Sequence, residues 1–355
     1  MSGPGGELLT GVRLADLTTL RLGGPPTVAV RVDTEAELVD VVRSLDAHDA
    51  ELLIVGGGSN LVVADEGFRG TVVLVRTRGI TAADAGPGEV DLTVSAGEPW
   101  DDLVRATVGD GFGELAALSG IPGLAGATPI QNVGAYGQEV ATVVRSVRVL
   151  DRASGGVDEL GPAVCGFGYR DSTFKRDRRY IVLAVTLRLR RGSRTPVRYA
   201  ELARSLGVPA GADAPAAAVR EAVLHLRRSK GMVIDPVPPG GTQDPDTVSA
   251  GSFFTNPVLA AAEASRLPAE APRFPAGEGL LKLSAAWLIE GAGFGRGYGH
   301  GAARISSRHP LALTNRGGAT TAELLALAGE IVVGVRDRFG LTLVPEPVLV
   351  GCSLP

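Results

Sequence analysis

Hydrophobic positions near the start of the chain predict a strand, a helix and a second strand in succession. In residues 27–33, valines alternate with other residues, which predicts a strand with one buried face. Thr34 is a suitable N-cap for a helix over 35–48, where apolar residues recur at helical spacing. The apolar run 52–55 predicts a short buried strand, and a strand–helix–strand unit favours parallel pairing.

The rest of the chain mixes strand-like and helical patterns, which predicts the α+β class with a parallel element near the start. Strand-like runs cover 71–76, 91–95, 144–150, 180–190 and 341–350. Helical patterns cover 100–108, 214–228, 283–291 and 320–338. Segments rich in glycine or proline, at 119–137, 236–250 and 267–279, predict irregular structure.

Composition and charge exclude several classes of protein. The 355 residues suggest two or three domains, at roughly 100–200 residues each. A net charge of -4 without a long basic run argues against a nucleic-acid partner or a membrane surface. No secretory signal and no run of about 20 apolar residues is present, so the cytoplasm is the expected compartment. Cys165 and Cys352 are far apart and the histidines lack ligand-like spacing, so no disulfide framework or metal site is expected.

The first candidate binding motif is the glycine loop Gly56-Gly57-Gly58-Ser59-Asn60. Successive glycines let backbone N–H groups converge on an anion, and the serine and asparagine side chains add donors. A Rossmann-type loop would be followed by a helix, whereas an apolar β-like run begins here at Leu61. Taken alone, the loop is more often a tight connection between strands.

The second candidate motif is the run SGIPGLAGATPIQNVGAYG at 119–137. Small residues alternate with rigid prolines, which suits a backbone that lies against a large flat ligand. The alternative is an irregular surface loop, but such a loop would rarely hold so many apolar residues.

Three further segments carry candidate catalytic groups, each with a plainer alternative. Arg170 beside Tyr169 suits bidentate binding of a carboxylate, although a solvated basic turn is commoner. Ser252 lies between a glycine and two phenylalanines, a dry setting for a hydroxyl that otherwise bonds to backbone. Glu346 is held between two prolines, but a lone loop carboxylate is more often simply exposed. Asn256 precedes a proline and fits a helix N-cap.

In this order, the motifs closely resemble those of the UDP-N-acetylenolpyruvoylglucosamine reductase family, from TLRLGGP at 19–25 to Glu346. The resemblance implies an α+β protein. Its two-part FAD-binding fold is of the vanillyl-alcohol-oxidase/PCMH type, and a C-terminal α+β substrate-binding domain follows. The implied domains are 1–70 (with part of the segment at about 340–355 packing near it), 71–212 and 213–355. The segment VRYAEL at 197–202 resembles the type I branch, whose extra loop carries a substrate-covering tyrosine.

The resemblance also implies an activity: NADPH-dependent, FAD-mediated reduction of UDP-N-acetylglucosamine enolpyruvate to UDP-N-acetylmuramate, a peptidoglycan precursor. NADPH gives hydride to FAD, which passes it to the enolpyruvyl carbon while the neighbouring carbon receives a proton. By motif position, Ser252 is the proton donor, and Arg170 and Glu346 stabilise the enol-like intermediate. The implied substrate-binding residues are Tyr169, Tyr199, Lys230 and Asn256.

The implied cofactor is FAD, with NADPH as the hydride donor and no metal. The expected flavin contacts are Gly56, Gly57, Gly58, Ser59, Asn60, Leu61, Ser119, Gly120, Ile121, Pro122, Gly126, Ala127, Gln131, Asn132, Gly134, Ala135, Tyr136 and Gly137. The glycine loop holds no histidine or cysteine, which favours a non-covalent flavin. No obligate protein partner is implied.

Two positions depart from the family pattern, and two other functions compete. Thr255 stands where relatives often carry lysine, so a cation near the substrate diphosphate is missing or replaced. Pro347 follows Glu346 where valine is usual.

The competing functions are a flavin oxidase of the same fold and a non-catalytic nucleotide-sugar-binding protein. The lack of a covalent attachment residue in the glycine loop opposes the first, and the three retained catalytic candidates oppose the second.

Overall fold

The computed structural model describes residues 5–237 and 240–355, which form two compact units, each built from separate stretches of the chain. Unit 1 contains residues 5–12, Pro26–Gly57 and Arg69–Arg228. The described part of unit 2 belongs to Arg13–Pro25, Gly58–Phe68 and Ser229–Pro355. The division into domains 1–70, 71–212 and 213–355 stays a prediction.

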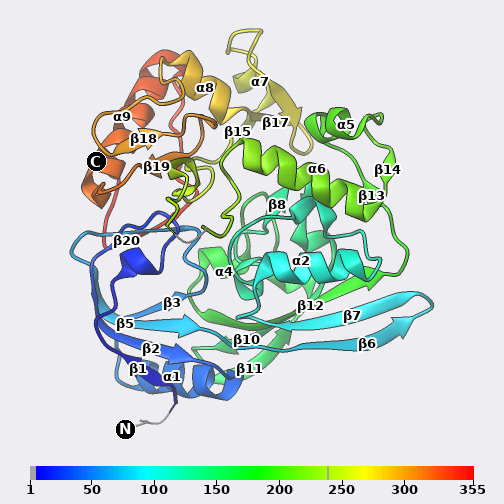
Figure 1. Ribbon diagram of the computed structural model, residues 1–355, viewed down its shortest axis with the longest axis vertical. Coiled ribbons are helices and arrows are strands. Elements are labelled where there is room, and N and C mark those ends of the chain that lie inside the picture. The colour runs from blue at the N-terminus through cyan, green and yellow to red at the C-terminus, as the bar shows by residue number, and fades with distance from the viewer. Residues whose placement is uncertain (1–4, 238–239) are drawn as a thin grey trace. The chain divides into compact units, whose positions relative to one another are not determined.

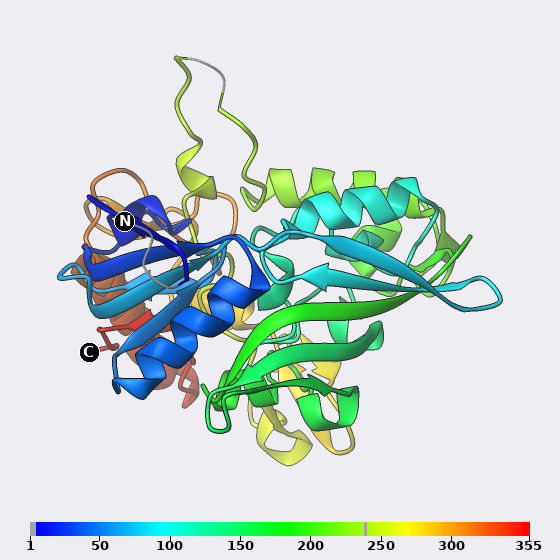
Figure 2. The same cartoon turned by 90° about the horizontal axis from the view of Figure 1, so that it is seen from below.

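The first sheet of unit 1 has four strands in the order β1–β2–β5–β3 (Figure 1). They are β1 (Glu7–Leu9), β2 (Pro26–Val32), β3 (Leu52–Val55) and β5 (Phe68–Val75). Helix α1 (Glu35–Ala47) shares a buried core with this sheet and runs along it in Figure 2. The Thr34 side chain accepts from the Glu37 N–H, and the Glu37 carboxylate accepts from the Thr34 N–H. This capping box confirms the predicted start of the helix.

The predicted strands 27–33 and 52–55 both exist, but they do not pair directly. Strand β5 lies between β2 and β3, and it pairs with β3 in parallel, with Leu52 opposite Thr71 and Val55 opposite Leu74. Residues 71–75 of β5 are buried without interruption, as a central strand covered on both faces requires. Local patterning therefore predicted the strands but not their order.

The second sheet of unit 1 is antiparallel, with five strands in the order β11–β10–β12–β7–β6. They are β6 (Ile80–Gly86), β7 (Glu89–Ser95), β10 (Val144–Asp151), β11 (Gly156–Leu160) and β12 (Tyr180–Arg190). Strand β6 was not predicted because its side chains are mostly exposed and show no apolar alternation. Helix α2 (Trp100–Gly109) buries Trp100 and Leu103 in the same core as β7, β10 and β12.

The remaining elements of unit 1 are short, apart from one long helix. They are η2 (Ala116–Leu118), η3 (Ala125–Ala127), β8 (Gly134–Ala135), β9 (Gln138–Glu139), η4 (Val140–Thr142), α3 (Pro162–Cys165), α4 (Thr173–Arg176), β13 (Thr195–Pro196), α5 (Ala200–Leu206), β14 (Asp213–Ala214) and α6 (Ala216–Ser229). Helix α6 confirms the prediction over 214–228. The segment 119–137 is mostly irregular, as expected.

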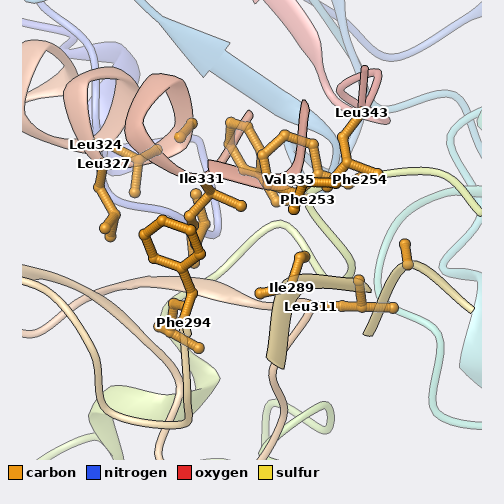
Figure 3. Close-up of a cluster of buried hydrophobic side chains, with 14 of the residues drawn as sticks. Phe253, Phe254, Ile289, Phe294, Leu311, Leu324, Leu327, Ile331, Val335 and Leu343 are labelled. Carbon is orange, nitrogen blue, oxygen red and sulfur yellow. The ribbon is translucent and has the colours of Figure 1, made fainter. Parts of the chain in front are cut away.

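Unit 2 is built around helix α9 (Thr321–Phe339), whose Thr320 capping box confirms another predicted start. Its other elements are η1 (Leu14–Asp16), β4 (Leu61–Val63), η5 (Pro245–Thr247), β15 (Val258–Ala260), α7 (Ala261–Ala264), β16 (Arg273–Pro275), β17 (Leu280–Leu283), α8 (Ala285–Gly291), β18 (Ala303–Ile305), β19 (Leu313–Asn315) and β20 (Val348–Val350). Phe253 and Phe254 lie in one core with Ile331 and Val335 of α9 (Figure 3). Strand β20 pairs in parallel with β4.

The predicted strand over 341–350 is wrong for most of its length, because only Val348–Val350 forms a strand. Residues 344–346 instead exchange isolated backbone hydrogen bonds with 253–255. Pro345 and Pro347 have no N–H to donate, so a continuous ladder cannot form here. The predicted irregular segment 236–250 contains the short helix η5, and its residues 238–239 lie outside the described part.

Candidate active site

The glycine loop and the 119–137 segment meet in unit 1 at a point that only glycine allows. A Cβ atom added to Gly57 would lie 2.7 Å from the Cα atom of Gly123. A Cβ atom on Gly126 would overlap Ala96. The two backbones therefore pack directly against each other, with no side chain between them. A glycine-rich backbone of this kind suits the diphosphate and the flat ring of a flavin nucleotide.

Helix α2 holds the start of the 119–137 segment in place. The Trp100 backbone N–H donates to the Gly123 carbonyl at 3.1 Å, and its indole N–H donates to the Leu118 carbonyl at 3.2 Å. The Ser119 hydroxyl donates to the Ala116 carbonyl at 2.7 Å and is fully buried. Ser119 thus supports the shape of the loop through its own hydrogen bond.

Asn132, a predicted flavin contact, connects the 119–137 segment by hydrogen bonds to the turn that precedes Arg170. Its side-chain amide donates to Glu139 at 2.8 Å and to the Gly168 carbonyl at 3.0 Å. Its side-chain oxygen accepts from the Ala141 N–H at 3.1 Å. The Ser172 hydroxyl adds a bond to the Ile130 carbonyl at 2.5 Å. The structure therefore brings the second and third sequence motifs together.

Arg170 is held in a defined position beside the 119–137 segment. Its Nη2 donates to the Gly134 carbonyl at 2.6 Å, and its guanidinium lies 5.5 Å from the centre of the Tyr169 ring. The Arg170 carbonyl accepts from the Lys175 ammonium at 2.9 Å. The cation is thus oriented before any ligand binds, as electrostatic stabilisation of a transition state requires.

Backbone strain also points to this region. Within residues 5–237 and 240–355, five non-glycine residues have positive φ, and three of them (Asn132, Tyr136 and Arg170) are predicted site residues. Non-glycine residues rarely adopt this conformation, and residues that do cluster at functional sites.

Tyr136 and Tyr199 form a second feature of unit 1. Their rings meet edge to face, with centroids 5.6 Å apart and planes at 87°. Burial, partly opposed by the charge of Arg227, raises the pKa of Tyr136 to about 12. Burial also raises the pKa of Tyr199, although 44% of its surface is exposed. Both phenols therefore stay protonated at neutral pH, and the predicted lid residue touches the predicted flavin segment.

Cys165 is unsuited to covalent attachment of a flavin. The residue is fully buried, and its thiol donates to the Leu160 carbonyl at 3.6 Å. Burial raises the pKa of this thiol to about 11. The reactive thiolate is therefore scarce at neutral pH, in keeping with the expected non-covalent flavin.

In unit 2 the structure brings Ser252 and Glu346 onto paired segments. The Glu346 N–H donates to the Phe253 carbonyl at 2.8 Å, and the Thr255 N–H donates to the Val344 carbonyl at 3.0 Å. Phe253 and Phe254 are each 1% exposed, so these anchors are rigid. Two of the three predicted catalytic residues therefore share one local framework. Arg170 belongs to unit 1, and its convergence with them stays a prediction.

The end of the glycine loop supports the same framework. The Asn60 side chain donates to the Glu346 carbonyl at 3.3 Å, and the Asn60 carbonyl accepts from the Val348 N–H at 2.9 Å. Gly58 has φ +61, and a Cβ atom there would overlap the Leu17 carbonyl. Residues 58–61 of the loop thus belong structurally to the segment that carries Glu346.

The helix-capping interpretation of Asn256 is wrong for the residues that follow it, since they form strand β15. The Asn256 side-chain oxygen instead accepts from the N–H of Ala285, the first residue of α8, at 2.9 Å. Lys230 directly follows α6 and is half-buried. The substrate-binding roles of both residues stay predictions.

Three charged residues near the flavin segment were not predicted: Asp101, Arg220 and Arg227. Arg220 and Arg227 are 8% and 6% exposed, on the helix predicted over 214–228. The available signal was their spacing. Seven residues apart, both arginines fall on the apolar stripe of that helix with Val219 and Val223, where a charge needs a buried partner.

Comparison with known proteins decides the family. The chain is 52% identical to the UDP-N-acetylenolpyruvoylglucosamine reductase of Thermobifida fusca over 354 residues, covering 97% of this chain and 98% of that protein. It is 53% identical to the Streptomyces coelicolor reductase, covering 96% and 90%. The chain belongs to the UDP-N-acetylenolpyruvoylglucosamine reductase family. The predicted family is therefore confirmed.

Family models and a solved structure agree with this membership. A model of the FAD binding domain matches residues 26–161, and one of the C-terminal domain of UDP-N-acetylenolpyruvoylglucosamine reductase matches residues 243–350. The crystal structure of the reductase from Thermus caldophilus is similar, with a TM-score of 0.62 and 26% identity over 96% of this chain and 97% of that one. The predicted fold class and the FAD cofactor are confirmed.

The two family models contain most of the predicted site residues, but Tyr169, Arg170, Tyr199 and Lys230 lie between the two matches. The glycine loop and the 119–137 segment lie within the FAD binding match, and so does Gly134, whose carbonyl accepts from Arg170. Ser252, Asn256 and Glu346 lie within the C-terminal match.

Among the described residues, no helix has the length and hydrophobicity needed to cross a bilayer. The same residues include no cluster of acidic, histidine or cysteine side chains suited to a metal ion.

Proposed function

We propose that this chain reduces UDP-N-acetylglucosamine enolpyruvate to UDP-N-acetylmuramate with NADPH and FAD, in the cytoplasm. The observation that carries the proposal is the pairing of 253–255 with 344–346, which supports Ser252 and Glu346 on one rigid framework. The retention of Arg170, Ser252 and Glu346 argues against a non-catalytic binding protein on this fold. The small-molecule substrate is a UDP-sugar, and no nucleic-acid, membrane or protein partner is part of the proposal.

When bound, FAD supplies the hydride chemistry, and the chain supplies orientation and charge. The residues that would hold it are the glycine loop with Leu61 and the predicted contacts within 119–137. Their fit rests on the crossing of Gly57 with Gly123, where a side chain on Gly57 would collide with the Gly123 backbone.

The three proposed catalytic residues divide the remaining chemistry. Hydride addition places negative charge on the enolpyruvyl group, and the fixed guanidinium of Arg170 would stabilise that charge. The Ser252 hydroxyl would give a proton to the neighbouring carbon, aided by its half-buried setting beside two buried phenylalanines. Glu346, fixed through its backbone and flanked by prolines, would stabilise the same intermediate.

Substrate binding is proposed for Tyr169, Tyr199, Lys230 and Asn256. Thr255 supplies no cation, because its side chain is an uncharged hydroxyl, which donates to the Val344 carbonyl at 3.4 Å. The lysine that relatives often carry at this position therefore has no replacement at residue 255 itself.

Anaerobic mixing with NADPH tests the proposed function. We expect the flavin absorption to bleach and then to return when UDP-N-acetylglucosamine enolpyruvate is added. A flavin oxidase would instead regain its colour with oxygen, and a non-catalytic binder would not bleach at all. Either of those results would contradict the proposal.

Replacing Tyr199 with alanine should weaken binding of the UDP-sugar by about 1–3 kcal/mol, through lost ring contact and a lost hydrogen bond. The exposed ring of Tyr199, supported from one side by Tyr136, is placed to cover a ligand. The measurement is the Michaelis constant for the sugar nucleotide. Tyr199→Phe is the control, since it keeps the ring contact and loses only the hydroxyl. An unchanged Michaelis constant in the alanine variant would show that Tyr199 does not cover the substrate.

A further inference from the structure

Gly120, in the predicted flavin segment, is held on both sides of its backbone by charged side chains of unit 1. Its N–H donates to Asp101 Oδ1 at 2.6 Å. Its carbonyl accepts from Arg227 Nε at 3.2 Å. Gly120 is buried and has φ +70, a conformation that glycine adopts readily. The directions of the two peptide groups that flank Gly120 are therefore set by the protein, before any cofactor binds.

Asp101 itself is held by a two-point ion pair. Arg220 Nη1 and Nη2 donate to the two carboxylate oxygens of Asp101 at 2.7 and 2.8 Å. Burial would raise the pKa of Asp101, but the hydrogen bonds from Arg220 and the Gly120 N–H, together with the charges of Arg220 and Arg227, lower it overall. The carboxylate thus stays ionised at neutral pH, and a bidentate pair of this kind fixes geometry as well as charge.

The pair joins two helices to the flavin segment. Asp101 lies in the first turn of α2, and Arg220 and Arg227 lie two turns apart on α6. Figures 1 and 2 both show α2 and α6 side by side. Arg227 is buried, and that burial lowers its pKa. Because two buried arginines adjoin one carboxylate, Asp101 supplies the negative charge that makes their burial tolerable.

We propose that Asp101 and Arg220 are a positioning pair for the flavin: by fixing the Gly120 peptide they set the affinity and the visible spectrum of bound FAD. This inference rests on the proposed flavin-binding role of the 119–137 segment. Without the pair, the Gly120 N–H can rotate, and the backbone dipoles that line the flavin segment lose their fixed direction. Neither residue is assigned a direct contact with the flavin.

The test measures FAD binding to apoprotein by quenching of flavin fluorescence, together with the visible spectrum of the complex. Asp101→Asn and Arg220→Gln should each weaken FAD binding about tenfold to a hundredfold, the usual effect of losing a buried hydrogen bond to a charged group. Both should shift the flavin bands. The double variant should bind FAD no more weakly than the worse single variant, because both changes remove one interaction.

A matched control separates positioning from general stability. Asp91 and Arg188 form an equally bidentate pair, at 2.8 and 2.8 Å, between β7 and β12. Asp91→Asn should lower the apoprotein's melting temperature while leaving FAD affinity and spectrum unchanged. Should Asp101→Asn fail to fold, Arg220→Lys carries the same test, since lysine keeps the charge but not the two-point geometry.

Three outcomes would overturn the inference. Unchanged FAD affinity and spectrum in the Asp101 and Arg220 variants would show that the pair does not act on the flavin. An equal loss of FAD affinity in the Asp91→Asn variant would show that the loss comes from lower stability of the protein and not from the position of Gly120. Wild-type apoprotein that fails to bind FAD would overturn both the proposed function and this inference. Wild-type binding with unaffected variants would overturn this inference alone.

Discussion

A Ser252→Ala variant should still bleach its flavin with NADPH at close to the normal rate, while its reoxidation by UDP-N-acetylglucosamine enolpyruvate becomes very slow. The first half-reaction needs no proton from Ser252. The second does, because the carbon next to the hydride acceptor must be protonated. Loss of a positioned acid typically costs ~10²–10⁴-fold in rate. Anaerobic stopped-flow absorbance measures the two steps separately.

A Ser252→Cys variant is the matched control, because a thiol can also donate a proton at this position. It should recover part of the reoxidation rate. The Phe253 and Phe254 anchors are unchanged in both variants, so the framework with Glu346 should persist. If the alanine variant reoxidises normally, Ser252 has only a structural role and the proton comes from elsewhere, with Glu346 or a bound water next to be tested.

An Arg170→Ala variant should lose about 10²–10³-fold in kcat, as removal of one preorganised donor to a developing negative charge does. Arg170 is oriented by the Gly134 carbonyl and the Tyr169 ring, so its charge needs no rearrangement during the reaction. The loss should fall on the step that consumes the enolpyruvyl substrate. Steady-state kinetics and the same two-step stopped-flow measurement check both statements.

Arg170→Lys separates charge from geometry at the same position. Lysine keeps the positive charge but cannot reproduce the planar guanidinium over Tyr169, so recovery should be partial. The positive φ of residue 170 is equally unfavourable for arginine, lysine and alanine, so backbone strain does not differ among the variants. A kcat in the alanine variant equal to that of the wild type would remove Arg170 from the mechanism.

Several parts of the fold could be predicted because they depend on neighbouring residues. The capping boxes at Thr34 and Thr320 involve residues three apart, and both helices begin where the sequence indicated. Strand β6 was missed because its exposed side chains show no alternation, and the strand over 341–350 was overestimated because an apolar run does not reveal what its backbone pairs with.

The candidate site was predictable only as a set of motifs. The motif residues identified the family because each glycine, arginine or serine occupies its place in a known order. Their mutual contacts could not be read in the same way. Asn256 illustrates this: its side chain caps α8, whose first residue is 29 positions away, rather than the segment that follows it.

The amino-acid sequence by itself determined the type of most elements, the family and the identity of the candidate catalytic residues, since these follow from local spacing and motif order. Only the tertiary structure decided that β5 lies between β2 and β3, and that the segment of Glu346 pairs with that of Phe253. It alone also revealed the bond between Asp101 and Arg220, which are 119 positions apart. Contacts at such separations depend on how whole elements pack, and local propensity carries no record of that packing.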